Sequence, residues 1–412
     1  MTGQTRSTSI IRFVSARWTI GRARALDADD GLAEMRKRFV LPDGVIYLDG
    51  NSLGALGSTV SERIHRTIDE EWGIALAAGW QGGGWLEAPE RIGDRIAPLI
   101  GALAGEVLVA DPTSIALAKL LSAALTARPS RRVIVSTTDN FPSDLYAAAG
   151  AAQLVGAELR VVDRADLAAA LTEEVGVCCL THVDFRSGEL HDIPRLTRAA
   201  HDAGALVLWD LCHSAGVLPV GCEENGIDLA VGCTYKYLNG GPGSPSFLYV
   251  RRTLQDQLEN PLPGWLGHDE PFGFEAEWRP AQGIRRFLTS TPPILALAAL
   301  DAALDAFEGV SLMAVRQKSM ALGQLFIEMV QEGNVPSLQV ASPLSPESRG
   351  SQVSLRHADA PAVIDAAMTR GVIGDFRTPD LCRFGFAPLY LSYEDAFRAA
   401  EVVLEVARSM EL

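Results

Sequence analysis

The sequence predicts an α/β protein with a large, mostly parallel sheet and a smaller C-terminal α/β domain. From Ile92 onward, short apolar runs of strand length alternate with helical patterns, and polar residues follow several of the apolar runs. The composition changes after Pro292 and Pro293, where an alanine-rich helix begins, and this change predicts the second domain. Functional groups are therefore expected at the carboxyl ends of the parallel strands.

The elements of the large domain follow one another through short connections. Helices are predicted over 91–104, 114–127, 142–154, 165–173 and 192–203, and the last of them ends at Gly204. Strands are predicted over 107–110, 132–136, 158–162, 175–183, 205–210, 229–234 and 246–250. This repeated β-α alternation predicts a doubly wound sheet.

The rest of the chain is divided from the same patterns. Residues 61–291 are predicted to be the large domain, and residues 25–60 an N-terminal segment that associates with the small domain and the functional site. The small domain, 292–412, is predicted to contain helices over 295–307, 310–332 and 360–370 and strands at 338–341, 351–355, 372–375 and 382–386. Ser392 is the predicted N-cap of its closing helix. Residues 1–24 carry five arginines and no acidic residue and are predicted to be a disordered leader.

Composition limits the classes of partner. The 412 residues are 48% hydrophobic and carry a formal net charge of −15, which argues against nucleic acid or an anionic membrane as the main partner. The six cysteines form no C-x-x-C pair and no Cys/His ligand spacing, so we expect a reducing cytoplasm and no structural zinc or other metal. No apolar run has the length of a membrane span, and a soluble protein is expected.

Lys236 is the most informative residue of the chain. It stands between Tyr235 and Tyr237 after an apolar strand, and the glycine-rich run GGPG follows it closely. A lysine held in such a confined turn can serve as nucleophile and base. Pyridoxal phosphate chemistry requires a Schiff-base lysine and an acid for the pyridinium nitrogen. Taken alone, a lysine at a strand end is more often an ordinary surface residue. The cofactor is favoured because Lys236 follows Asp210, which ends an earlier apolar strand.

Asp210 ends the apolar run ALVLW, where a carboxylate needs a cationic or hydrogen-bonding partner. A pyridinium nitrogen would supply one. The alternative is a core aspartate tied to backbone N–H groups or to His213, and His213 itself could simply cap the strand end.

A phosphate group needs a helix N-terminus with hydroxyl groups and free amides. Thr113 and Ser114 open a helix after an apolar run, and Ser143 and Asp144 open the next one. Phe141 could cover one face of a cofactor ring, and Thr181 ends a third strand. Ordinary capping explains each of these hydroxyl groups equally well when it is taken alone.

Arg383 lies in an otherwise apolar strand of the small domain, where a guanidinium requires an anion. Asp375 or Asp380 could be a structural partner. If the partner is instead a substrate α-carboxylate, the small domain becomes a lid over the cofactor.

Together these residues and eight ordered segments resemble the kynureninases, a family of fold-type-I pyridoxal phosphate enzymes. The segments are YLDGNSLG (47–54), GWQGGGW (79–85), FPSDLY (141–146), WDLCHSAG (209–216), TYKYLNGGPGSP (234–245), GWLGH (264–268), LTSTPPIL (288–295) and RFGFAPLY (383–390). The resemblance covers nearly everything from Ala25 onward and implies the fold-type-I fold, with a large domain around a mostly parallel sheet and a smaller α/β domain.

The resemblance also implies roles for particular residues. Lys236 matches the Schiff-base lysine and Arg383 the arginine that binds the substrate carboxylate. The cofactor-binding set that it implies is Thr113, Ser114, Phe141, Ser143, Asp144, Thr181, Asp210, His213, Tyr235, Trp265 and Thr291. Some of these contacts cross a dimer interface in relatives, so a homodimer with shared active sites is implied. Trp80 and Thr291 follow the bacterial pattern, which favours L-kynurenine over 3-hydroxykynurenine, although Trp80 could also be a packing residue.

The implied reaction is hydrolytic Cβ–Cγ cleavage of L-kynurenine to anthranilate and L-alanine, a step of tryptophan catabolism. Lys236 would remove the Cα proton, Asp210 would keep the ring nitrogen protonated, and Tyr235 is the candidate proton relay. Two alternatives stay open. One is another fold-type-I enzyme, such as a cysteine desulfurase or a class V aminotransferase, for which only Cys222 lies outside the strand-like runs. The other is a non-catalytic regulatory protein that binds the cofactor.

Overall fold

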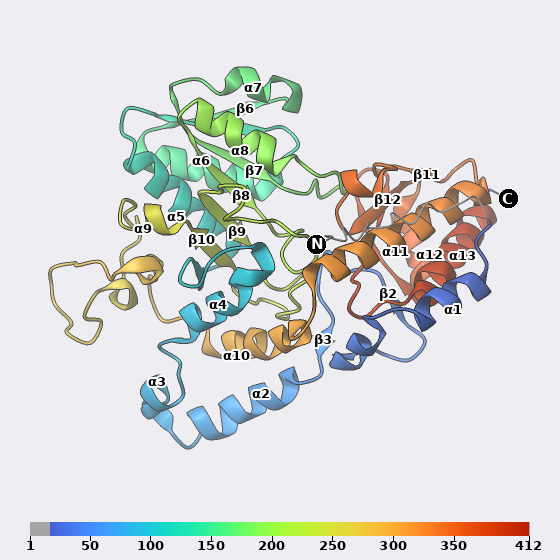
Figure 1. Cartoon of the computed structure of the whole chain (residues 1–412), viewed down its shortest axis with the longest axis horizontal. Coiled ribbons are helices and arrows are strands. Elements are labelled where there is room, and N and C mark those ends of the chain that lie inside the picture. The colour runs from blue at the N-terminus through green and yellow to red at the C-terminus, as the bar shows by residue number, and fades with distance from the viewer. Residues whose placement is uncertain (1–16, 412) are drawn as a thin grey trace, which may run out of the picture.

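The computed structural model describes residues 17–411 in two bodies that lie side by side (Figure 1). The larger body contains a seven-stranded sheet in the order β4-β10-β9-β8-β7-β5-β6. The strands are β4 (Val107–Val109), β5 (Val133–Thr137), β6 (Glu158–Val162), β7 (Val175–Thr181), β8 (Leu206–Asp210), β9 (Leu229–Gly232) and β10 (Phe247–Val250). Strands β5 to β9 pair in parallel, whereas β10 runs antiparallel to both neighbours. The predicted mostly parallel sheet is confirmed.

Alternate residues of each strand pack on opposite faces of this sheet, as strand geometry requires. On β8, Leu208 packs into the core that contains apolar residues of α5 and α6, and Trp209 packs into the core that contains those of α4 and α8. Helices therefore cover both faces. The helices of this body are α4 (Ala88–Ile100), α5 (Thr113–Thr126), α6 (Pro142–Val155), α7 (Leu167–Ala170), α8 (Ile193–Asp202) and α9 (Arg252–Gln255). The helix expected over 165–173 is only the short α7, preceded by a 3-10 turn at Arg164–Asp166.

The smaller body is built on a four-stranded antiparallel sheet in the order β11-β12-β15-β14. Its strands are β11 (Gln339–Val340), β12 (Gln352–Arg356), β14 (Asp375–Arg377) and β15 (Leu381–Gly385), and its helices are α11 (Leu312–Gly333), α12 (Ala360–Thr369) and α13 (Tyr393–Ser409). Ser392 caps α13 in a full capping box with Asp395, as the sequence indicates.

One predicted strand of the small body is divided in the structure. The segment expected at 372–375 becomes β13 (Val372–Ile373), which pairs in parallel with β2 (Ile46–Tyr47), and β14, which pairs with β15. Gly374 separates them, and a Cβ atom there would approach the Arg383 carbonyl oxygen to 2.8 Å. The chain can therefore pass from one sheet to the other only because residue 374 has no side chain.

The N-terminal segment joins the two bodies. Helix α1 (Ile20–Ala28) packs against α13, and the Asp27 carboxylate accepts the N–H groups of Tyr393 and Glu394 at 2.6 and 2.9 Å. Residues 1–16 of the predicted disordered leader lie outside the described residues. The prediction extends the leader to residue 24, but α1 begins at Ile20 because its contacts with α13 stabilise it. Strands β1 (Phe39–Val40) and β3 (Leu56–Gly57) pair with each other farther along.

Helix α10 (Ile294–Ala303) packs against α2 (Val60–Arg66) and α4, on the side of the large sheet, although the sequence analysis places it in the small domain. Its composition explains the difference, because a helix that is apolar on nearly every side must be covered by several elements. A short α3 (Gly79–Gly82) follows α2 along the chain (Figure 1). Within residues 17–411, none of the helices combines the length and the apolar character of a membrane span.

Candidate active site

A cavity of about 530 Å³ opens at the carboxyl ends of the parallel strands and at the N-termini of α5 and α6. Thr181 and Asp210 are paired neighbours at the ends of β7 and β8, so their positions follow from strand register. Ten of the predicted site residues line this cavity: Thr113, Ser114, Phe141, Ser143, Asp144, Thr181, Asp210, His213, Tyr235 and Lys236.

Two buried carboxyl groups lie together in the cavity. Asp210 Oδ1 accepts the Cys212 N–H at 2.8 Å, so the backbone contact considered as an alternative is present, whereas His213 contacts Gln352 instead. Asp144 is 2% exposed, and its Oδ2 has no hydrogen-bond partner among residues 17–411. Burial raises the pKa of Asp144 well above its usual range, and the neighbouring Asp210 carboxylate raises it further. The pair therefore offers one carboxylate and one readily protonated acid.

Lys236 follows β9 and is partly exposed to the cavity. Its Nζ makes no hydrogen bond or ion pair with any residue from 17 to 411, and it lies 6.0 Å from the centre of the Tyr235 ring. The turn that carries it is closely packed, since the Gly54 N–H donates to the Tyr235 carbonyl at 2.7 Å. A Cβ atom on Gly54 would approach the Lys236 carbonyl oxygen to 2.2 Å. The glycine of YLDGNSLG thus allows the N-terminal segment to support the lysine turn.

The start of α5 has the properties of an anion site. No side chain caps this helix, whose first two residues, Thr113 and Ser114, line the cavity. A partly buried ion pair holds Asp111, two residues before the helix, because Lys119 Nζ donates to Asp111 Oδ2 at 2.6 Å and to the Phe287 carbonyl at 2.8 Å. This pair fixes the entry into the helix and neutralises the Asp111 carboxylate close to the expected phosphate.

Several lining residues were not predicted. Val183 and Phe185 follow β7, Cys212 follows β8, and Ser244 belongs to the glycine-rich run after Lys236. Ligands of α/β sheets bind beyond the carboxyl ends of the strands, and this rule could have indicated Val183, Phe185 and Cys212 from the sequence. Ser244 Oγ accepts a hydrogen bond from Thr234 Oγ1 at 2.6 Å, which closes the loop after the lysine, and only the folded loop reveals this contact.

Four predicted residues do not line the cavity of the single chain. Trp80 and Trp265 contact each other edge to face at 6.1 Å, in an aromatic cluster with Trp85, Phe272 and Phe274. Thr291 is exposed two residues before Pro293, which does line the cavity. Arg383 lies on β15 in the small body. The roles of these four residues stay predictions.

Arg383 is 1% exposed and is fully engaged within the chain. Its Nε and Nη2 atoms donate to the two carboxylate oxygens of Asp375 at 2.7 and 2.5 Å, and its Nη1 donates to the Phe185 carbonyl at 2.5 Å. The structural partner proposed as an alternative is therefore Asp375, whereas Asp380 pairs with Arg356. Burial alone would raise the pKa of Asp375, but the hydrogen bond and charge of Arg383 outweigh it and lower that pKa.

Asp49 stands beside this ion pair, bridged to Gly385 of β15. Burial, and then the negative charge of Asp375, raise the pKa of Asp49 to about 7. Because the folded-state pKa is higher than the unfolded one, the folded chain binds the proton more tightly between about pH 4 and pH 7. The associated stability is complete at low pH and is lost as the pH rises through the folded-state pKa.

We expect Asp49→Asn to remove this dependence. Relative to the variant, the wild-type free energy of unfolding should fall by about 1–2 kcal/mol between pH 5 and pH 8. Urea unfolding at the two pH values measures the difference, with the exposed Asp43→Asn as the matched control. Parallel pH profiles for wild type and Asp49→Asn would contradict the raised pKa.

The cavity fits pyridoxal phosphate on three observations. The uncapped start of α5 suits the phosphate, the Lys236 amine is unpaired within residues 17–411, and the orphaned buried Oδ2 of Asp144 beside Asp210 requires a hydrogen-bonding partner. Thr113, Ser114 and Ser143 would hold the phosphate, Asp210 the ring nitrogen, and Lys236 the aldehyde carbon.

Comparisons with known proteins agree with this fit. Residues 315–403 match the family model of the kynureninase C-terminal domain. A kynureninase of Pseudomonas fluorescens is 47% identical over 390 residues, covering 93% of this chain and 94% of that protein. A kynureninase of Burkholderia pseudomallei strain 1106a is 47% identical over 392 residues, with the same coverage of both chains.

Solved structures share the fold at low sequence identity. The apo cysteine desulfurase of Thermococcus onnurineus NA1 superimposes with a TM-score of 0.75 at 20% identity, covering 91% of this chain and 98% of that one. A C-DES variant with glycine covalently linked to its pyridoxal phosphate cofactor has a TM-score of 0.74 at 17% identity, covering 89% of this chain and 98% of that one. The chain thus has the fold-type-I fold, with a cavity that fits pyridoxal phosphate. At 47% identity over nearly its whole length, the chain belongs to the kynureninase family.

Proposed function

We propose that this chain hydrolyses L-kynurenine to anthranilate and L-alanine with pyridoxal phosphate as its cofactor. The observation that carries the proposal is that Lys236, Asp210 and the uncapped start of α5 meet in one cavity of a kynureninase-family chain. A bound cofactor supplies an electron sink for negative charge at the substrate α-carbon. The protein must therefore orient the substrate, move protons and admit one water molecule.

The proton-handling groups follow from their surroundings. Lys236 Nζ is the proposed base that removes the α-proton, since no other described side chain holds it. Asp210 is proposed to keep the ring nitrogen protonated. Burial raises the pKa of Tyr235, so its phenol stays protonated at neutral pH and can donate a proton near the substrate carbonyl but cannot act as the resting base.

Arg383 is proposed to bind the substrate α-carboxylate. Asp375 occupies the edge formed by Nε and Nη2. Nη1 also donates to the Phe185 carbonyl and Nη2 to the Ser52 hydroxyl, so a substrate carboxylate would have to replace these two contacts. Since Arg383 does not line the cavity, the proposal includes a movement of the small body toward the cavity when substrate binds.

The decisive experiment incubates the purified chain with pyridoxal phosphate and L-kynurenine. We expect anthranilate, followed by its fluorescence, and L-alanine in equal amounts. A chain that binds the cofactor yet forms no anthranilate would overturn the proposal. Cysteine serves as a second substrate for the desulfurase alternative, which the structure does not favour because Cys222 is fully buried and burial raises the pKa of its thiol.

We also propose that L-kynurenine is preferred over 3-hydroxykynurenine, which rests on Trp80 and Thr291. The two kcat/KM values measured side by side test this preference.

All six cysteines are free thiols, which suits the proposed reducing cytoplasm.

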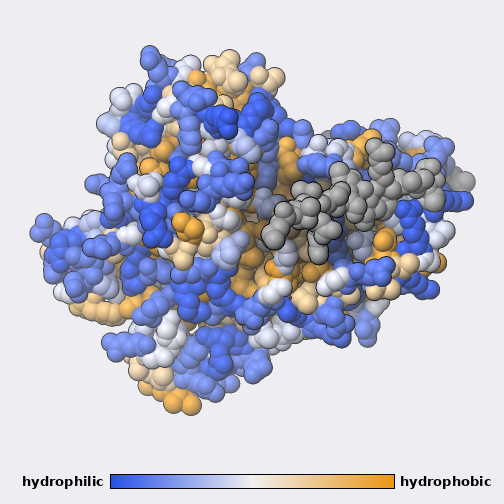
Figure 2. All heavy atoms as spheres, in the orientation of Figure 1, coloured by the Kyte–Doolittle hydropathy of each residue, from blue (hydrophilic) through white to orange (hydrophobic). Residues whose placement is uncertain are grey.

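We propose a homodimer in which each active site takes residues from both chains. Large apolar side chains are exposed between α2 and α3, where Trp72 is 57% and Ile74 79% exposed, and in the loop that carries Phe274, which is 77% exposed. Figure 2 shows hydrophobic atoms at the tip of the segment that Figure 1 draws between α2 and α3. Such side chains are usually covered by a partner. The nearby Trp80 and Trp265 are then the residues that would reach the second chain's cavity.

Mixing two inactive variants tests shared sites. We expect Lys236→Ala and Trp265→Ala chains to be weakly active alone and to recover about a quarter of wild-type activity after they are mixed and allowed to exchange subunits. The fraction follows because about half of the dimers are mixed and each mixed dimer has one intact site. Recovery should appear in sedimentation fractions of dimer size. No recovery in demonstrably mixed dimers would contradict the shared site.

A further inference from the structure

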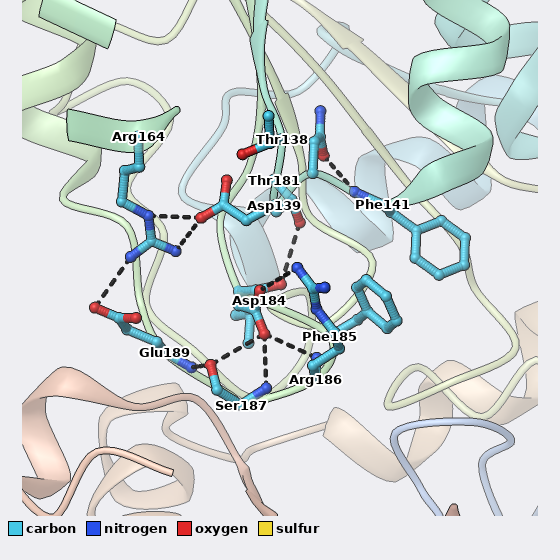
Figure 3. A network of polar contacts seen from close by, with 12 residues as sticks. Thr138, Asp139, Phe141, Arg164, Thr181, Asp184, Phe185, Arg186, Ser187 and Glu189 are labelled. Carbon is cyan, nitrogen blue, oxygen red and sulfur yellow. Dashed lines mark hydrogen bonds and ion pairs between the residues drawn. The ribbon is translucent and has the colours of Figure 1, made fainter. Parts of the chain in front are cut away.

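The loop after β7, residues 182–191, connects the cavity to the small body. Asp184 is 5% exposed, and its Oδ1 accepts the N–H groups of Arg186 and Ser187 at 2.9 and 2.6 Å, which fixes the turn (Figure 3). On the other side, the Gly350 N–H donates to the Gly188 carbonyl at 2.7 Å. Hydrogen bonds therefore hold the turn of the loop and join the loop to the small body.

Phe185 within this loop has two distinct contacts. Its ring lies edge to face against Phe141 of the cavity at 4.9 Å, and both rings are visible side by side in Figure 3. Its carbonyl oxygen accepts from Arg383 Nη1 at 2.5 Å and from Gln352 Nε2 at 3.1 Å. One carbonyl group thus links the proposed carboxylate-binding arginine to a glutamine of β12.

Gln352 is 1% exposed and reaches back to the cavity. Its Oε1 lies 3.0 Å from His213 Nδ1, and His213 lines the cavity. The amide orientation is decided by its partners: the Phe185 carbonyl can only accept, so Nε2 must face it and Oε1 must face the imidazole. Since Oε1 is also only an acceptor, His213 Nδ1 must carry a proton.

The charge of the imidazole follows from its surroundings. Burial, and then the positive charges of Lys236 and Arg383, lower the pKa of His213 well below its usual range. The ring is therefore neutral at pH 7, and with its proton on Nδ1 the Nε2 atom has a free lone pair.

We propose that Gln352 is a positioning residue: it holds His213 in the Nδ1–H tautomer and connects it, through the Phe185 carbonyl, to Arg383. The consequence is that a glutamine of the small body decides which polar atom of His213 is presented to the cofactor cavity. The same glutamine shares the Phe185 carbonyl with Arg383, the arginine proposed to bind the substrate carboxylate. The inference about Arg383 rests on the proposed function, whereas the tautomer of His213 does not.

The test reads the tautomer directly by two-bond ¹H–¹⁵N NMR on protein labelled with ¹⁵N-histidine, recorded with and without pyridoxal phosphate. The chain has seven histidines, and His213→Asn assigns the signal of interest. We expect Nδ1–H in the wild type, an Nε2–H population in Gln352→Met, and a proton retained on Nδ1 in Gln352→Glu, whose carboxylate still accepts. Gln339→Met, the same change on an exposed residue of β11, should leave the signal unchanged.

Activity provides a second readout once turnover is established. Gln352→Met should lower kcat/KM about tenfold or more, because it leaves the buried Nδ1–H without its acceptor, while Gln339→Met should not. An Nε2–H tautomer in wild type, or an unchanged tautomer in folded Gln352→Met, would overturn the proposal. Neither result depends on kynurenine turnover, so failure of the proposed function would be recognised separately by the absence of anthranilate.

Discussion

Replacing Lys236 with alanine is expected to lower kcat for L-kynurenine by about 10⁴-fold or more, because one side chain is proposed to hold the cofactor covalently and to act as the base. The change should leave the fold intact, since Lys236 Nζ has no hydrogen bond or ion pair with residues 17–411 that would be lost. Anthranilate fluorescence measures turnover, and the visible absorbance of bound pyridoxal phosphate measures the state of the cofactor.

The matched control is Lys37→Ala, which removes an exposed lysine whose partner is Glu34. It should keep wild-type turnover. Borohydride reduction of the loaded wild type followed by peptide mass analysis should place the cofactor on Lys236. A modified lysine elsewhere, or turnover within tenfold of wild type in Lys236→Ala, would refute the assignment.

Changing Asp210 to asparagine is expected to lower kcat by about 10²–10³-fold, because an amide cannot stabilise the positive charge on the ring nitrogen as a carboxylate does. Asp144 lies in the same buried pair and loses a negative neighbour in this variant, so its pKa should decrease. A newly ionised Asp144 can then replace part of the lost charge. We therefore expect the double variant Asp144→Asn with Asp210→Asn to be less active than either single variant.

The comparison needs kcat, the affinity for pyridoxal phosphate and the absorbance spectrum of all three variants. Asp202→Asn, an exposed position on α8 outside the cavity, serves as the control and should behave as wild type. If Asp210→Asn binds the cofactor and turns over normally, the ring nitrogen has another partner. If the double variant equals Asp210→Asn alone, Asp144 makes no compensating contribution.

The local sequence was sufficient for most of the cavity. Asp210 and Thr181 end apolar runs, and Thr113, Ser114, Ser143 and Asp144 begin helices directly after such runs. In a parallel sheet these positions meet at one edge by geometry, so strand ends and helix starts account for these six residues of the cavity. The resemblance to a family added roles that patterning could not supply.

Contacts between distant segments were not readable from local patterns. A buried arginine requires an anionic partner, and this requirement can be read from the sequence. Whether Asp375 or Asp380 pairs with Arg383 depends on how β14 and β15 align. The contact between Gln352 and His213 joins residues from two sheets, and no periodicity marks either one. Likewise the split between β13 and β14 depends on the partner that β2 provides.

Local patterns were sufficient for the α/β class, the order of the elements, and the positions of Asp210 at the end of a strand and of Lys236 in the turn after one. Strand length, helix period and capping are local properties. Three features depend on the tertiary structure: Arg383 pairs with Asp375, α10 packs beside the large sheet, and Gln352 contacts His213. These are choices among chemically equivalent partners, and the free energy that selects one of them comes from packing between segments far apart in the chain.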